Sequence, residues 1–179
     1  MNVTRFRNLC GALNLVLKFM ALIAVVSVFA GIGNYLNNSF TVSRDFSPGF
    51  TLINTSSGSL EDFTNSQIAL AEVVTKSLSL LVVAFLLVVG SNILLDIWLE
   101  KSPFSEKQTQ RLTVISLGII ILSLVQSPLF SAVLSAASPS ARFISFDIGW
   151  LFIFGMVMLC MTGIFKYGAA LQKLSDDTV

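Results

Sequence analysis

Four long apolar runs dominate the hydrophobic pattern of this chain. They cover about residues Leu13–Tyr35, Ser77–Leu99, Leu112–Leu134 and Phe146–Phe165. A bilayer core about 30 Å thick is crossed by roughly 20 apolar residues that each rise about 1.5 Å in a helix. A soluble bundle would show a polar stripe at helical spacing on every helix, and these runs lack one. The pattern predicts an all-α membrane protein in which residues 1–179 form one domain of four transmembrane helices.

Lysine and arginine positions predict how these spans are oriented. Eight of the eleven basic residues lie in or beside the N-terminal segment, the linker at 100–111 and the C-terminal tail. Cytoplasmic loops carry the excess of positive charge. We therefore expect both termini and this linker inside, with one larger extracytoplasmic loop at residues 36–75. An alternative is that the first span, with Arg5 and Arg7 before its apolar core, is a cleaved signal peptide.

The larger loop contains two patterns. Phe40, Val42 and Phe46 alternate before Pro48-Gly49, a pair that suits a type II turn, so the loop has room for a short β-hairpin. From about Asn65 the pattern becomes helical, and no breaker separates it from the second span. This predicts one continuous helix from about residue 66 to 100, whereas the alternative is a loop followed by a separate span.

Four polar residues lie at membrane depth on the first two spans. Asn14 and Lys18 are four residues apart, as are Asn92 and Asp96, so each pair shares a helix face. An ionisable residue within a span is costly unless it is paired. We expect Lys18 and Asp96 to pair across these spans, with the two asparagines satisfying the remaining groups. The alternative is that each charge reaches the headgroups separately.

The third span carries serines at every fourth position, namely Ser123, Ser127, Ser131 and Ser135. Small residues on one face allow helices to approach closely and to form hydrogen bonds across the contact. This spacing predicts a helix-packing stripe.

Two short motifs fall on the predicted cytoplasmic side. In SPFSEKQTQRL, Pro103 disfavours a helical Ser102, and Ser105 with Gln108 forms a capping box that starts the third span. The tail ends in an acidic segment. One docking surface for a cytosolic protein would use Pro103, Phe104, Ser105, Gly168, Leu171, Asp176 and Asp177. The alternative is ordinary turn and tail chemistry.

SPFSEKQTQRL after an apolar span, and the ending IFKYGAALQKLSDDTV, resemble domain-of-unknown-function family 2975, whose members are small four-span bacterial membrane proteins. Ser102 departs from the glycine that many members have there. The resemblance covers essentially the whole chain but implies no biochemical activity. Members are often encoded beside a small helix-turn-helix regulator, which implies a cytosolic partner of that type for a protein in the bacterial cytoplasmic membrane.

Composition narrows the choice of function. The chain has no histidine, and its two cysteines are isolated, so neither the commonest general base nor a metal-binding cysteine pair is present. We expect no metal or other cofactor and no enzymatic activity. A net charge of +1 without a basic patch argues against direct nucleic-acid binding. The leading hypothesis is a sensory or regulatory protein, and the alternative is a small transporter or channel subunit that uses Lys18 and Asp96 and forms a homo-oligomer.

Overall fold

The computed structural model describes residues 3–39, 51–99, 106–138 and 141–176. Four helices in the described residues are long and apolar enough to cross a membrane. They are α1 (Val3–Leu36), α2 (Asn65–Trp98), α3 (Glu106–Ala137) and α4 (Trp150–Asp176). This confirms the prediction of four helices with the length and apolar composition of membrane spans.

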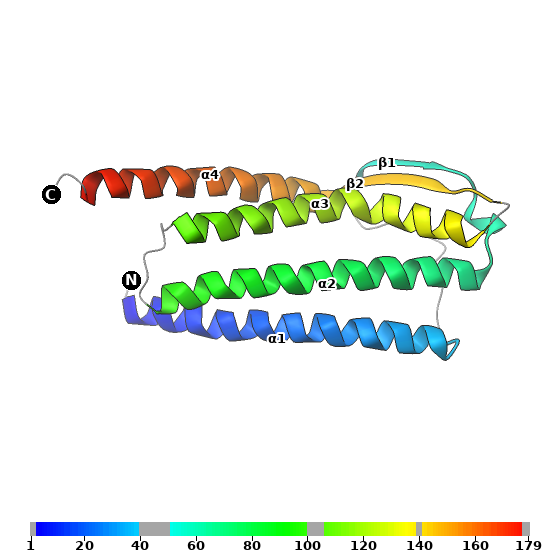
Figure 1. Cartoon of the computed structure of the whole chain (residues 1–179), viewed down its shortest axis with the longest axis horizontal. Helices are drawn as coiled ribbons and strands as arrows, with labels where there is room; N and C mark the ends of the chain where they lie inside the picture. Colours follow the sequence, from blue (N-terminus) through cyan, green and yellow to red (C-terminus); the bar gives the residue numbers. More distant parts are fainter. Residues whose placement is uncertain (1–2, 40–50, 100–105, 139–140, 177–179) are drawn as a thin grey trace.

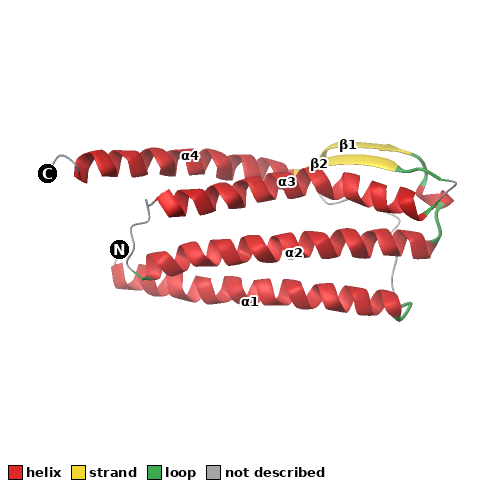
Figure 2. Ribbon diagram, in the orientation of Figure 1, coloured by secondary structure: helices red, strands yellow, loops and turns green. Residues whose placement is uncertain are grey.

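The helices lie side by side in chain order (Figure 1). Helix α1 packs on α2, α2 on α3, and α3 on α4. Both chain termini are at one end, which we call the terminal end, and the strands are at the other, which we call the sheet end (Figure 2). Small residues permit the close contacts. Ala21, Ala24 and Ala84 join α1 to α2, and Gly118 lies against Leu86 of α2.

Helix α2 is continuous over 34 residues, as the sequence predicts. At about 1.5 Å per residue it is about 51 Å long, well beyond the roughly 30 Å of a bilayer core. It begins with a capping box in which Thr64 and Gln67 each bond the other's backbone N–H. The Gln67 side-chain amide also donates to the Ala137 carbonyl at 2.9 Å, so one residue ties the start of α2 to the end of α3.

The sheet end has its own small core. Phe63 precedes α2, and with Ile68 it packs on Phe130 and Leu134 of α3 and on Phe143. The rings of Phe130 and Phe143 meet edge to face, with their centroids 6.3 Å apart. This core fixes the loops on the last turns of α3.

Two strands form an antiparallel sheet, β1 (Thr51–Ser57) and β2 (Ile144–Gly149). Each strand comes from a different loop, so the sheet joins the loop after α1 to the loop after α3. Gly58, which follows β1, has a φ of 100°, and a Cβ there would lie 2.5 Å from the Arg142 carbonyl oxygen. The hairpin expected around Pro48-Gly49 lies outside the described residues.

Strand β2 corrects the predicted start of the fourth span. That span was expected to begin at Phe146, but residues 144–149 are extended and the helix begins at Trp150. The physical reason is a period of two, since Phe143, Ser145 and Asp147 are buried whereas Ile144 and Phe146 are exposed.

Candidate functional site

Asp96 is bonded to Arg111, a residue that the sequence analysis did not identify. Its carboxylate accepts a hydrogen bond from Arg111 Nη1 at 2.6 Å, and the side chains of Asp96 and Arg111 are 10% and 22% exposed. Arg111 Nη1 also donates to the backbone carbonyl of Asn92 at 3.1 Å. The pair joins α2 to α3 at the terminal end.

The predicted pair between Lys18 and Asp96 is therefore wrong. Gly11 of α1 lies against Trp98, and Leu17 lies beside Gly90, so Lys18 is near the level of Gly90. Six residues separate Gly90 from Asp96, which is about 9 Å along a helix. The Lys18 side chain is exposed, and the transport hypothesis loses the pair on which it was built.

Of the two asparagines, the structure brings only Asn92 to the Asp96–Arg111 pair, and it does so through the Asn92 backbone. Asn14 Oδ1 is buried without a hydrogen-bond partner in the described part of the chain. A signal for Arg111 existed in the sequence. Asp96 and Arg111 are nearly equally far in sequence from Pro103, so the turn that the sequence predicts at Pro103 would place them opposite each other.

Three serines of the α3 stripe, Ser127, Ser131 and Ser135, bond to β2 or to Phe143 just before it. The Ser145 N–H donates to Ser131 Oγ at 2.8 Å, and the Ser145 hydroxyl lies 2.9 Å from Ser131 Oγ and 2.8 Å from Ser127 Oγ. One step further along, the Phe143 N–H donates to Ser135 Oγ at 3.1 Å, and Ser135 Oγ donates to the Phe143 carbonyl at 2.9 Å. The stripe is a packing surface, but its partner is β2.

These bonds explain how a short strand can lie on a membrane helix. A strand backbone needs partners on both edges, since buried unpaired N–H and C=O groups are costly. Strand β1 bonds one edge of β2, and the serine hydroxyls of α3 supply partners on the side that faces the helix.

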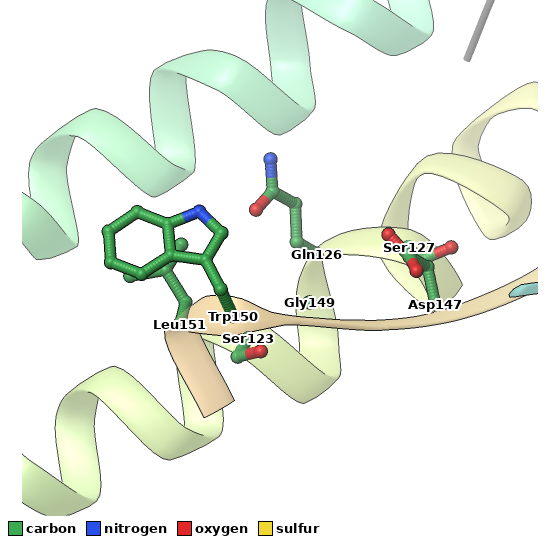
Figure 3. Close-up of a pocket in the computed structure, with 7 residues that line it drawn as sticks. All are labelled: Ser123, Gln126, Ser127, Asp147, Gly149, Trp150 and Leu151. Carbon is green, nitrogen blue, oxygen red and sulfur yellow. The ribbon is translucent and has the colours of Figure 1, made fainter. Parts of the chain in front are cut away.

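A cavity of about 40 Å³ lies where β2 meets α4. Ser123, Gln126 and Ser127 line it from α3, and Asp147, Gly149, Trp150 and Leu151 line it from β2 and α4 (Figure 3). Asp147 is only 7% exposed, and its Oδ1 has no hydrogen-bond partner among the described residues. Burial raises the pKa of Asp147 above its ordinary value of 3.8.

Sequence reasoning missed Asp147 because it placed this residue at the edge of a span. The signal that could have found it is the alternation in FISFDIG, which puts an acidic residue in register with buried neighbours.

The cytoplasmic docking candidates are described only in part. Pro103, Phe104 and Ser105 lie outside the described residues, as does Asp177. Gly168 and Leu171 lie on α4, where the Leu171 side chain is 49% exposed, and Asp176 ends the helix.

Comparisons with protein-family models, with curated proteins and with solved structures found no match. The resemblance to family 2975 therefore stays a prediction.

Proposed function

We propose that this chain is a non-enzymatic regulatory protein of the bacterial cytoplasmic membrane, in which the state of the sheet end controls binding of a cytosolic protein at the terminal end. Both termini are on the cytoplasmic side in this proposal, in keeping with the distribution of lysine and arginine.

The observation that carries the proposal is the position of α3 between two polar contacts. Near the sheet end its serines bond to β2, and near the terminal end its Arg111 bonds to Asp96 of α2. Its 32 residues form one continuous helix that contains Pro128 between these contacts. A continuous helix that is bonded near both ends can transmit a displacement from one end to the other.

The last turns of α4 support a docking role. Helix α4 has 27 residues, about seven more than a bilayer core requires, so its end extends past the membrane. Leu171 and Leu174 in this extension are 49% and 63% exposed, and Tyr167, one turn before Leu171, is 68% exposed, so the three recur at helical spacing. Apolar residues at this spacing are the pattern by which a helix docks into a groove on a partner.

The partner that fits is a small basic protein of the helix-turn-helix type. Asp176 and Asp177 follow the apolar residues of α4 and would steer a basic surface toward them. The resemblance to family 2975 points to the same class of partner. In this scheme the membrane protein binds the regulator and keeps it away from DNA.

Co-purification tests this proposal. The tagged protein, extracted in detergent, should retain a co-expressed helix-turn-helix regulator encoded beside its gene. Phe104→Ala together with deletion of residues 176–179 should reduce the retained amount at least about tenfold, the effect of losing roughly 1.4 kcal/mol or more. Phe29→Ala is the matched control, because Phe29 is 70% exposed in the last third of α1, toward the sheet end. Equal capture by the wild type and the docking variant would contradict the proposed surface.

A further inference from the structure

Among the described residues, no basic side chain is placed to balance the charge of an ionised Asp147. The segments that pack around it are β1, residues 112–137 of α3 and residues 150–165 of α4, and none of them contains Asp, Glu, Lys or Arg. The closest basic residue in sequence, Arg142, is exposed. Within the described ranges, ion pairs join Lys76 to Glu72 and Arg111 to Asp96.

An ionised carboxylate in this position is unfavourable unless something neutralises it. Burial of an unpaired charge costs several kcal/mol, so such groups bind a counter-ion or take up a proton. Asp147 is 7% exposed and its Oδ1 lacks a hydrogen-bond partner in the described chain, yet the residue lines a cavity that also contains hydroxyl and amide groups. The missing positive charge can therefore be supplied within the cavity.

The cavity selects the kind of cation. Its other polar groups include the hydroxyls of Ser123 and Ser127 and the amide of Gln126 (Figure 3). Uncharged oxygen donors suit hard cations and give no preference for transition metals. Asp147 supplies one negative charge, which fully balances the charge of a monovalent cation but not that of a divalent one. A volume of about 40 Å³ exceeds the roughly 10–15 Å³ that one water requires, so the cavity has room for a small ion together with water.

We propose that this cavity binds one small monovalent cation such as Na⁺ through the carboxylate of Asp147, beside which Ser127 lies, with Ser123 and Gln126 as further polar groups of the lining. The site goes beyond the proposed regulatory function and does not depend on it. The Ser127 hydroxyl also lies 2.8 Å from the Ser145 hydroxyl of β2. A bound ion would therefore stabilise the contact between the sheet and α3.

Protonation of Asp147 is the alternative way to remove its charge. Protonation predicts a definite direction in which folding stability changes with pH. The raised pKa means that the folded state holds a proton more tightly than the unfolded state, whose pKa is near 3.8. Stability would then fall as pH rises from about 3.8 through the raised pKa of the folded state. If the proton alone neutralises Asp147, this fall is the same with and without Na⁺. If Na⁺ binds, Na⁺ reduces the fall, because it stabilises the ionised form.

Equilibrium dialysis of the detergent-purified protein against ²²Na⁺ at pH 7.5 tests the proposal directly. We expect about one ion per chain, and with Na⁺ at about ten times its Kd we expect a rise of roughly 3–6 °C in Tm relative to N-methyl-D-glucamine at equal ionic strength. Asp147→Asn should lose both effects, whereas Asp62→Asn, which removes an exposed carboxylate at the same end, should keep them.

Ser123→Ala provides a second variant in case Asp147→Asn does not fold. It removes one donor from the cavity and should weaken Na⁺ binding about tenfold. Binding that is absent in the wild type, or unchanged in both cavity variants, would overturn the proposal. A Tm that responds to pH but not to Na⁺ would also overturn it, in favour of a proton alone. None of these results depends on capture of a cytosolic partner.

Discussion

Replacing Asp96 by leucine is expected to destabilise the protein by about 3–4 kcal/mol, because the substitution leaves Arg111 without its partner in a mostly buried position. Arg111→Met should cost a similar amount for the converse reason. The double variant should be more stable than the sum of the two losses predicts, by about 1–3 kcal/mol, since no uncompensated charge is left. Unfolding in detergent, followed by circular dichroism, measures each variant.

Two controls test whether the coupling between the two variants is specific to the Asp96–Arg111 pair. Lys18→Met combined with Asp96→Leu should give additive losses of stability. Lys18 is exposed, and it lies opposite Gly90 of α2 rather than opposite Asp96. Lys76→Met should cost less than about 1 kcal/mol, since the Lys76 side chain is 65% exposed in its pair with Glu72. Coupling to Lys18 instead of Arg111 would restore the pairing that the sequence suggested.

The difference between Lys18 and Arg111 shows what the sequence could not supply. Apolar runs determine how many spans there are, and the absence of a breaker after Asn65 predicts that α2 is continuous. Pairing across helices depends instead on how far one helix is shifted along its axis relative to its neighbour. A shift of one or two turns exchanges one partner for another, and the residue pattern of a single helix does not reveal that shift.

The serine stripe and Asp147 illustrate a second limit. A spacing of four residues reveals that one face of α3 carries small polar groups, but the same face can pack on a helix or bond to a strand. The segment FISFDIG is apolar enough to be read as the start of a span, and its alternation alone indicates a strand. Once that segment is assigned to a span, the buried Asp147 and its cavity cannot be found.

Replacing Ser131 by alanine is expected to destabilise the protein by about 2–3 kcal/mol, because the Ser145 N–H loses its buried acceptor and the Ser145 hydroxyl loses one of its partners. Ser135→Ala should cost about 1–2 kcal/mol by leaving the backbone groups of Phe143 unpaired. Combined, these variants should raise the rate of amide hydrogen exchange at Phe143 and Ser145.

Ser27→Ala is the matched control for these variants. Ser27 donates to the Ile23 carbonyl within α1 and is exposed, so its removal should change stability by no more than about 0.5 kcal/mol. Equal effects of Ser27→Ala and Ser131→Ala on stability and exchange would mean that the stripe does not hold β2.

The proposed regulatory role requires that the sheet end of the protein face outward and that the terminal end face the cytoplasm. Cysteine labelling tests this claim most directly, in a background with Cys10→Ser and Cys160→Ser. Asn54→Cys on β1 and Gln110→Cys near the start of α3 both place a thiol at an exposed position. In intact bacterial cells, a membrane-impermeant maleimide should label Asn54→Cys at once and Gln110→Cys only after the cytoplasmic membrane is permeabilised. The reverse pattern, with Gln110→Cys labelled in intact cells and Asn54→Cys protected, would contradict the account.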